Sequence, residues 1–273
     1  MLNDSELAEL EDVARRCRRD IVRMTHKAGS GHPGGSLSAI DALVVLYLRH
    51  MRVRPEDPLW HERDMFFLSK GHCTPAYYAA MAARGYVPHE ELLTFRAMGS
   101  RLQGHPSNTH LPGVDSSSGS LGQGLSLANG AALAARYEGL GARYYVMIGD
   151  GESQEGQIWE AAMTAAAQGL DNVCAIVDVN GIQLDGTVES VKSLGDLPAK
   201  WRAFGWNVID IDGHDLRAVD DALTEAARTK GVPTTIISRT VKGKGVSFME
   251  NTAKYHGLAP TDEELTTALE ELR

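Results

Sequence analysis

The sequence predicts an α/β fold with three layers, in which helices cover both faces of a mostly parallel sheet. Between residues 144 and 239, strand-like segments alternate with helix-like segments, which is the pattern of a parallel sheet. Strands covered on both faces are apolar almost throughout, as in the run YYVMI at 144–148. We find no internal repeat, low-complexity tract or linker, so residues 1–273 are interpreted as one domain.

The first half of the chain is expected to be mainly helical. Apolar residues between positions 7 and 24 recur on one helical face, which predicts a helix over residues 4–28. Asp4 or Ser5 is expected to cap this helix, and Gly29 is expected to end it. The other expected elements are helices at 38–50, 76–84 and 125–137, a buried strand at 65–69, and a loop rich in Gly, Ser and Pro at 99–124.

The second half carries the alternating pattern. The expected strands are 144–150, 173–179, 207–211 and 234–239, and the expected helices between them are 158–168, 198–204 and 216–228. A final helix is expected at 261–272. Thr261 would be its N-cap, and Glu264, three residues later, would be the acid of a capping box.

Composition excludes several classes of function. The chain of 273 residues carries 36 acids against 27 Lys and Arg, a net charge of −9, and no basic patch that would indicate a nucleic-acid partner. No apolar run is long enough to span a membrane, and no secretion signal is indicated. Cys17, Cys73 and Cys174 are far apart, so we expect no disulfide framework and a cytoplasmic location. A phosphate site in so acidic a chain would need a metal or local cations.

Two polar residues stand where neighbouring strands are expected to end. Asp150 lies at the end of one strand, between two glycines, and Asn180 lies at the end of the next. Ligands of parallel sheets bind at the carboxyl ends of strands, and Mg²⁺ prefers oxygen ligands such as carboxylate and amide groups. Gly151 would let the backbone approach a phosphate. The alternative for the G-D-G triplet is a tight turn or a helix cap.

Four histidines lie in glycine-rich stretches that are expected to be loops: His32, His72, His105 and His256. Such loops can hold an imidazole in a cleft, where it grips phosphate or exchanges protons with hydroxyl groups. Lys242 and Lys244, after the last strand, could supply local positive charge, or could belong to a solvated turn. The remaining histidines are interpreted as structural or surface residues: His26, His50, His61, His89, His110 and His214.

Together these stretches resemble the N-terminal, diphosphate-binding half of transketolase, over nearly the whole chain. The motifs are SGHPGG at 30–35, RDMFFLSKGH at 63–72, GSRLQGHP at 99–106, LPGVD at 111–115, GSLGQG at 119–124, GDGESQEGQIWEA at 149–161 and DVNGIQLDG at 178–186. Each motif is weak alone, but all of them in this order are specific. Deoxyxylulose phosphate synthase and 2-oxoacid dehydrogenase subunits share the G-D-G signature, whereas the N-G-I-Q-L-D-G and G-H-P stretches look closer to transketolase.

The resemblance implies a thiamine diphosphate-binding domain of the diphosphate (PP) type and a role for each matching residue. Asp150, Asn180 and the Ile182 carbonyl would hold Mg²⁺, or Ca²⁺ or Mn²⁺ in its place. The cofactor contacts would come from His72, Gly119, Leu121, Gly151, Glu152, Leu184, Lys242 and His256, with Asn180 and Ile182 acting through the metal. His32 and His105 would face the substrate, so that all four histidines would take part in catalysis. Glu155 and Glu160 resemble acids that meet across a subunit interface.

One required part of the chemistry is missing. In this family, a glutamate on a second domain, the pyrimidine-binding domain, activates the cofactor, and arginines there grip the sugar phosphate. We expect no room for such a domain within 273 residues. The resemblance therefore implies the smaller subunit of a split transketolase, in an α₂β₂ assembly with a C-terminal subunit. It would move a two-carbon ketol unit from a ketose phosphate to an aldose phosphate, as in the pentose phosphate route.

Two alternatives stay open. One is the same ketol transfer on a specialised substrate, such as a branched sugar, a sulfosugar or a biosynthetic acyl acceptor. The other is a non-catalytic half-enzyme. The presence of all the expected site residues favours an enzyme.

Overall fold

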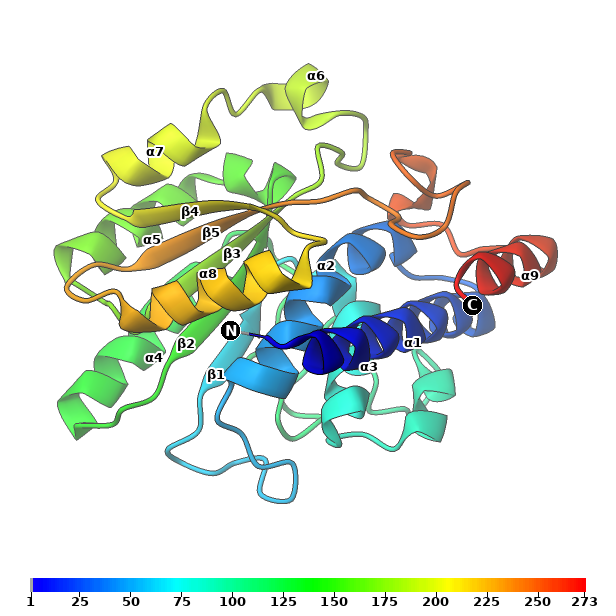
Figure 1. Cartoon of the computed structure of the whole chain (residues 1–273), viewed down its shortest axis with the longest axis horizontal. Helices are drawn as coiled ribbons and strands as arrows, with labels where there is room; N and C mark the ends of the chain where they lie inside the picture. Colours follow the sequence, from blue (N-terminus) through cyan, green and yellow to red (C-terminus); the bar gives the residue numbers. More distant parts are fainter. Residues whose placement is uncertain (1) are drawn as a thin grey trace.

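A computed structural model describes residues 2–273 and shows a sheet between two layers of helices (Figure 1). The strands are β1 (Met65–Leu68), β2 (Tyr144–Gly149), β3 (Val173–Val179), β4 (Asn207–Asp212) and β5 (Thr234–Arg239). Within the described residues they form a parallel sheet in the order β1-β2-β3-β5-β4. The predicted α/β class, the three layers and the parallel sheet are confirmed.

The helices divide between the two faces of the sheet. They are α1 (Asp4–Ala28), α2 (Pro33–Val45), α3 (Thr74–Arg84), α4 (Gly124–Glu138), α5 (Gly156–Ala167), α6 (Val188–Lys192), α7 (Leu197–Ala203), α8 (Leu216–Arg228) and α9 (Asp262–Glu271). Helices α1, α2, α3 and α8 pack on one face, and α4, α5 and α7 pack on the other (Figure 1). No helix in residues 2–273 is both long and apolar enough to cross a membrane.

Successive side chains of each strand pack alternately into two separate hydrophobic cores. In β2, Tyr145 and Met147 belong to the core under α1, α2 and α3, whereas Val146 and Ile148 belong to the core under α4 and α5. Successive side chains of a strand point to opposite faces, so a strand covered on both sides must be apolar at every position. This explains why the sequence of β2 shows no polar alternation.

Several helix ends differ from the sequence expectation. Helix α1 is capped by Asn3, not by Asp4 or Ser5: the Asn3 side chain accepts from the Glu6 N–H, and the Glu6 carboxylate accepts from the Asn3 N–H. Asn, Asp and Ser are equally good N-cap residues, so the helix begins after the one that can form a capping box with an acid three residues later. The predicted end at Gly29 is confirmed by its left-handed conformation.

Helix α2 begins at Pro33, five residues earlier than expected, and closes with a π-helical turn, Leu46–His50. Proline suits the first turn of a helix because its missing N–H would have no partner there. The two glycines that follow Pro33 hid this start. The predicted capping box of Thr261 and Glu264 is confirmed at the N-terminus of α9, the last helix of the chain.

Candidate active site

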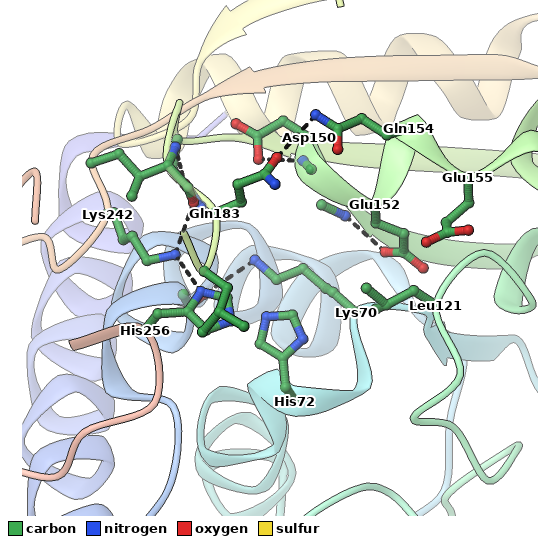
Figure 2. Close-up of a pocket in the computed structure, with 16 residues that line it drawn as sticks. Lys70, His72, Leu121, Asp150, Glu152, Gln154, Glu155, Gln183, Lys242 and His256 are labelled. Atoms are coloured by element: carbon green, nitrogen blue, oxygen red, sulfur yellow. Dashed lines mark hydrogen bonds between the residues drawn. The ribbon is translucent and has the colours of Figure 1, made fainter. Parts of the chain in front are cut away.

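The candidate site is a pocket at the carboxyl ends of neighbouring strands. Strands β1, β2, β3 and β5 are adjacent and parallel, so the loops that follow them meet at one edge of the sheet. These loops bring together residues 70–72, 149–155 and 180–184, with Lys242 and His256 from the C-terminal part of the chain, around a cavity of about 260 Å³ (Figure 2). The expected meeting of strand-end residues therefore occurs.

The four histidines that the sequence singled out form one cluster. The ring centroid of His32 lies 5.1 Å from that of His72, 5.5 Å from that of His256 and 6.4 Å from that of His105. The centroids of His72 and His256 are 5.0 Å apart. His32 occupies the N-cap position of α2, so the early start of that helix fixes its place.

Burial keeps this cluster neutral near pH 7. It lowers the pKa of His32 to about 4 and that of His256 to about 3, and nearby positive charges lower both further. Burial also lowers the pKa of His72 and His105, together with the charges of Lys70 and Arg96 respectively. The Nδ1 atom of His32 is buried and has no hydrogen-bond partner among the described residues. Neutral imidazoles can accept or donate a hydrogen bond to a sugar hydroxyl group.

Asp150 and Asn180, which the sequence suggested as metal ligands, line the same pocket. The Asp150 carboxylate is buried and accepts hydrogen bonds from the N–H groups of Gly151 (2.7 Å) and Gly181 (2.6 Å). Burial, and then the charge of Asp178, raises the pKa of Asp150 to about 6. The Asn180 amide nitrogen donates to Asp178 (2.9 Å), which leaves the amide oxygen to accept from the Ile182 N–H (3.1 Å). Asp178 thus fixes the orientation of the Asn180 amide group.

Lys242 lies inside the pocket and not in a solvated turn. Its side chain is 2% exposed, and its Nζ lies 2.9 Å from both the Ile182 carbonyl oxygen and the His256 Nδ1 (Figure 2). Burial, and then the charge of Lys70, lowers the pKa of Lys242 to about 8, so it is still mostly charged at pH 7. Lys244 lies elsewhere, in a second cavity.

Sequence reasoning missed a buried ion pair beneath the pocket. Lys70 donates to Asp178 (2.5 Å), and both side chains are almost fully buried. Ser38 (2.7 Å) and Thr240 (2.5 Å) also donate to the Asp178 carboxylate. Burial alone would lower the pKa of Lys70, but the Asp178 carboxylate and its neighbours raise it overall. In the sequence, the one feature that pointed to these residues is that Lys70 lies in the RDMFFLSKGH motif and Asp178 in the DVNGIQLDG motif.

Glu152 lines the pocket, but its carboxylate is used within the chain. It accepts hydrogen bonds from the Ser69 hydroxyl and from the N–H groups of Gly122 (2.8 Å) and Gly149 (2.9 Å). It therefore links the loop after β1, the loop before α4 and the end of β2. Its expected contact with the cofactor stays a prediction.

The other expected site residues lie at the rim or outside the pocket. Leu121 and Leu184 line the pocket and are 36% and 63% exposed, respectively. Gly119 has φ +147° and lies against the ring of His105, where a Cβ would come within 3.4 Å. Glu155 is exposed at the rim, whereas Glu160 lies in a groove between α4 and α5.

The remaining histidines lie outside this cluster. His26, His50, His89 and His214 contact aspartates, His61 contacts Glu138, and His110 contacts the hydroxyls of Ser107 and Thr109. These contacts are structural or lie at the surface.

Comparison with known proteins agrees with this geometry. Residues 10–272 match the thiamine diphosphate-binding domain of transketolase. The 6-deoxy-6-sulfo-D-fructose transketolase subunit SqwG of Clostridium sp. (strain MSTE9) is 44% identical over 264 residues, which cover 97% of this chain and 96% of that protein. One of the subunits of the apulose-4-phosphate transketolase of Phocaeicola vulgatus is 40% identical over 267 residues, which cover 98% and 95% respectively.

Solved transketolase structures share the fold. The transketolase of Campylobacter jejuni superimposes with a TM-score of 0.92 at 32% identity, covering 99% of this chain and 43% of that one. The transketolase of Leishmania mexicana gives 0.91 at 33% identity, covering 96% and 41%. This chain thus spans about two fifths of the length of these solved chains.

The matches place the chain in the class of α/β domains that bind thiamine diphosphate. Within that class, the chain belongs to the transketolase family, to which its sequence motifs pointed.

Proposed function

We propose that this chain is the diphosphate-binding subunit of a two-chain transketolase. It would transfer a two-carbon ketol unit from an anionic ketose to an aldose, together with a C-terminal subunit that carries the pyrimidine-binding domain and the activating glutamate. The observation that carries the proposal is the cluster of four neutral histidines, two of which, His72 and His256, line the Asp150–Asn180 pocket. The relatives from Clostridium sp. and Phocaeicola vulgatus, which match over nearly their full length, are themselves named as subunits.

The pocket fits a divalent ion with a diphosphate. Within residues 2–273, no three Asp, Glu, His or Cys side chains group as a metal cluster, so the ion would rest on a mixed set of oxygens. Asp150 supplies a carboxylate, Asn180 an amide oxygen and Ile182 a carbonyl, which suits Mg²⁺, and phosphate oxygens and water would complete the shell. Gly151 provides room, because a Cβ there would lie 3.1 Å from the Gln183 Cβ.

Each side of the pocket would then have a task. Bound thiamine diphosphate supplies an electron sink for the carbon–carbon bond that breaks. Lys242, His72 and His256 would bind the diphosphate, and His32 and His105 would hold the substrate hydroxyl groups and move their protons. Leu121 and Leu184, at the rim, would meet the cofactor rings.

The assembly and setting are part of the same proposal. We infer that residues 1–273 form one domain and that it assembles as α₂β₂, with Glu155 and Glu160 at a subunit interface. The three free, buried cysteines support a cytoplasmic location. The names of the relatives, which specify 6-deoxy-6-sulfo-D-fructose and apulose 4-phosphate, support a specialised anionic substrate over a general pentose phosphate role.

Binding and turnover test the proposal together. Calorimetry would measure thiamine diphosphate and Mg²⁺ binding by this chain alone and by its mixture with a candidate partner, sought first in the neighbouring gene, and a ketol-transfer assay would follow. We expect tight binding and turnover only in the mixture. Asp150→Ala should remove both, and Asp12→Ala, an exposed control on α1, should change neither.

Other outcomes are equally informative. Turnover by this chain alone would contradict the need for a partner. Failure of the mixture to bind cofactor would contradict the metal site, and would favour the non-catalytic alternative.

A further inference from the structure

Arg96 stands out because its guanidinium has neither a carboxylate nor a backbone carbonyl as a hydrogen-bond partner in the described residues. Its only side-chain hydrogen bond in the described residues is to the Ser30 hydroxyl (3.2 Å), and its Nε is buried without a partner. Four other half-buried arginines are paired with carboxylates: Arg18 with Asp41, Arg49 with Asp220, Arg63 with Asp115 and Arg101 with Glu91. Arg84 and Arg143 also lack an acid partner and also have a buried Nε without a partner, but their terminal nitrogens donate to backbone carbonyl oxygens. A buried polar group without a partner costs free energy, so a native structure keeps one where something else will satisfy it.

The backbone around Arg96 is shaped to hold it. Arg96 has φ +60°, a left-handed conformation that in the described residues only Asn251 shares among non-glycine residues. Such conformations cost about 1–3 kcal/mol and cluster at functional sites. The Arg96 N–H donates to the Leu102 carbonyl (2.9 Å), which closes the loop between the two residues.

Arg96 lies between two of the histidine loops. A Cβ on Gly104 would come within 2.7 Å of the Arg96 Nε, so the guanidinium packs directly on the residue before His105. Ser30, which it contacts, is two residues before His32. Only a glycine at 104 leaves room for this arrangement.

This position is separate from the diphosphate pocket. The charge of Arg96 lowers the pKa of His32 and His105, but it is not among the causes that lower the pKa of His72 and His256, which lie next to Lys242 or Lys70. Arg96 does not line the diphosphate pocket, and it packs against Gly104 and Ser30, so its charge lies on the side of the cluster that holds His105 and His32.

We propose that Arg96 binds the terminal anionic group, phosphate or sulfonate, of the sugar substrate. This inference rests on the proposed function and names a substrate contact on this chain in addition to those of the partner. The planar guanidinium binds tetrahedral oxyanions through two parallel hydrogen bonds, which a neutral sugar cannot offer. In a chain of net charge −9, one unpaired cation beside the substrate also offsets the repulsion of an anion.

The test compares anionic and neutral forms of one sugar in the assembled two-chain enzyme. The donors are fructose 6-phosphate, 6-deoxy-6-sulfofructose and fructose, with one common acceptor. We expect Arg96→Gln to lower kcat/KM for an anionic donor by roughly 10- to 100-fold more than for fructose, mainly through KM. Arg96→Lys should recover part of the loss, because lysine keeps the positive charge but lacks the pair of parallel donors of the guanidinium. A loss with only one of the two anionic donors would identify whether phosphate or sulfonate is bound.

Arg101→Gln is the matched control. Arg101 lies on the same segment, but it is paired with Glu91 through two hydrogen bonds (2.6 and 2.7 Å), so the anionic-to-neutral ratio should not change. Equal loss for all three donors on Arg96→Gln would overturn the inference, and weakened association of the subunits would assign Arg96 to a carboxylate of the partner chain.

Direct binding separates this inference from the proposed function. Calorimetry of each sugar with the cofactor-loaded complex requires no turnover. If no ketol transfer occurs but anionic sugars bind and Arg96→Gln weakens them selectively, the anion site stands and the reaction assignment falls. If ketol transfer occurs and the binding of anionic sugars is unchanged by Arg96→Gln, the anion site falls and the reaction assignment stands.

Discussion

Replacing Glu152 by alanine should destabilise the fold even when cofactor and partner are both absent. The carboxylate is 4% exposed and joins three loops through the Ser69 hydroxyl and the N–H groups of Gly122 and Gly149. Alanine would leave those donors without an acceptor. Glu152 therefore stabilises the folded site through these hydrogen bonds, independently of any contact with the cofactor.

The expected size follows from these contacts. Each backbone N–H left unsatisfied costs about 1–3 kcal/mol, so the two together cost about 2–6 kcal/mol. Burial raises the pKa of Glu152, with the three donors opposing it, so removal of the charge offsets part of that cost by removing a desolvated carboxylate. We expect Glu152→Ala to lower the free energy of unfolding by about 3 kcal/mol. Glu152→Gln should lower it less, because one oxygen remains to accept.

Urea unfolding followed by tryptophan fluorescence measures this change, since Trp201 and Trp206 are buried in the core under α4 and α5. Glu155→Ala is the matched control: Glu155 is exposed three residues away, and no hydrogen bond of its side chain occurs in the described residues, so a change within about 0.5 kcal/mol is expected. An unfolding midpoint for Glu152→Ala equal to that of the unaltered chain would refute a stabilising role of Glu152. If cofactor binding is lost while stability is unchanged, the carboxylate contacts the cofactor directly.

Three further predictions concern stability and pH. Lys70→Met should cost about 3–5 kcal/mol by leaving Asp178 buried without its cation, and adding Asp178→Asn should restore part of it; an additive double mutant in urea unfolding would contradict the pairing. Burial lowers the pKa of His32 to about 4, so between pH 6.5 and 4 the unfolded chain binds a proton that the folded chain does not, and stability falls as the pH drops through that window. His32→Asn should flatten this dependence, and an unchanged slope between about pH 7 and 5 would count against a neutral His32. Asn3→Ala should cost about 1 kcal/mol through loss of the α1 capping box, whereas no shift of the thermal midpoint would show that the end of α1 is frayed in solution.

Much of the site could be predicted because its geometry follows from local patterns. An apolar strand that ends in Gly-Asp-Gly places Asp150 at the carboxyl edge of the sheet, and parallel neighbours bring Asn180 to the same edge. The histidines were recognisable because glycine and proline around them indicate loops. Their convergence, with centroid distances between 5.0 and 6.4 Å, then follows from those loops meeting at one edge.

The missed features depend on partners far apart in the chain. Lys70 and Asp178 are 108 residues apart, and no periodicity or spacing connects a buried lysine to its counterion. Glu152 looked like a first-turn acid of a helix, and only the fold shows that it reaches two other loops. Arg96 gave no signal at all, because an unpaired cation is recognisable only when every nearby carboxylate has been located.

The charges inside the pocket explain why a metal would be required. Among the side chains that line the pocket, Lys70 and Lys242 contribute two positive charges, and the ionised forms of Asp150, Glu152 and Glu155 contribute three negative ones, so the lining sums to −1. Lys70 is already paired with Asp178, whereas Lys242 has no carboxylate partner in the described residues and contacts only the Ile182 carbonyl oxygen and the His256 ring, so Lys242 is the pocket lysine expected to meet a phosphate. A diphosphate would therefore enter a site that is on balance repulsive, and a divalent ion beside Asp150 would change the sum to +1. In this proposal the Lys70–Asp178 ion pair holds the amide of Asn180 in place through Asp178, and the oxygens of Asp150, Asn180 and Ile182 would bind the ion that brings the missing positive charge.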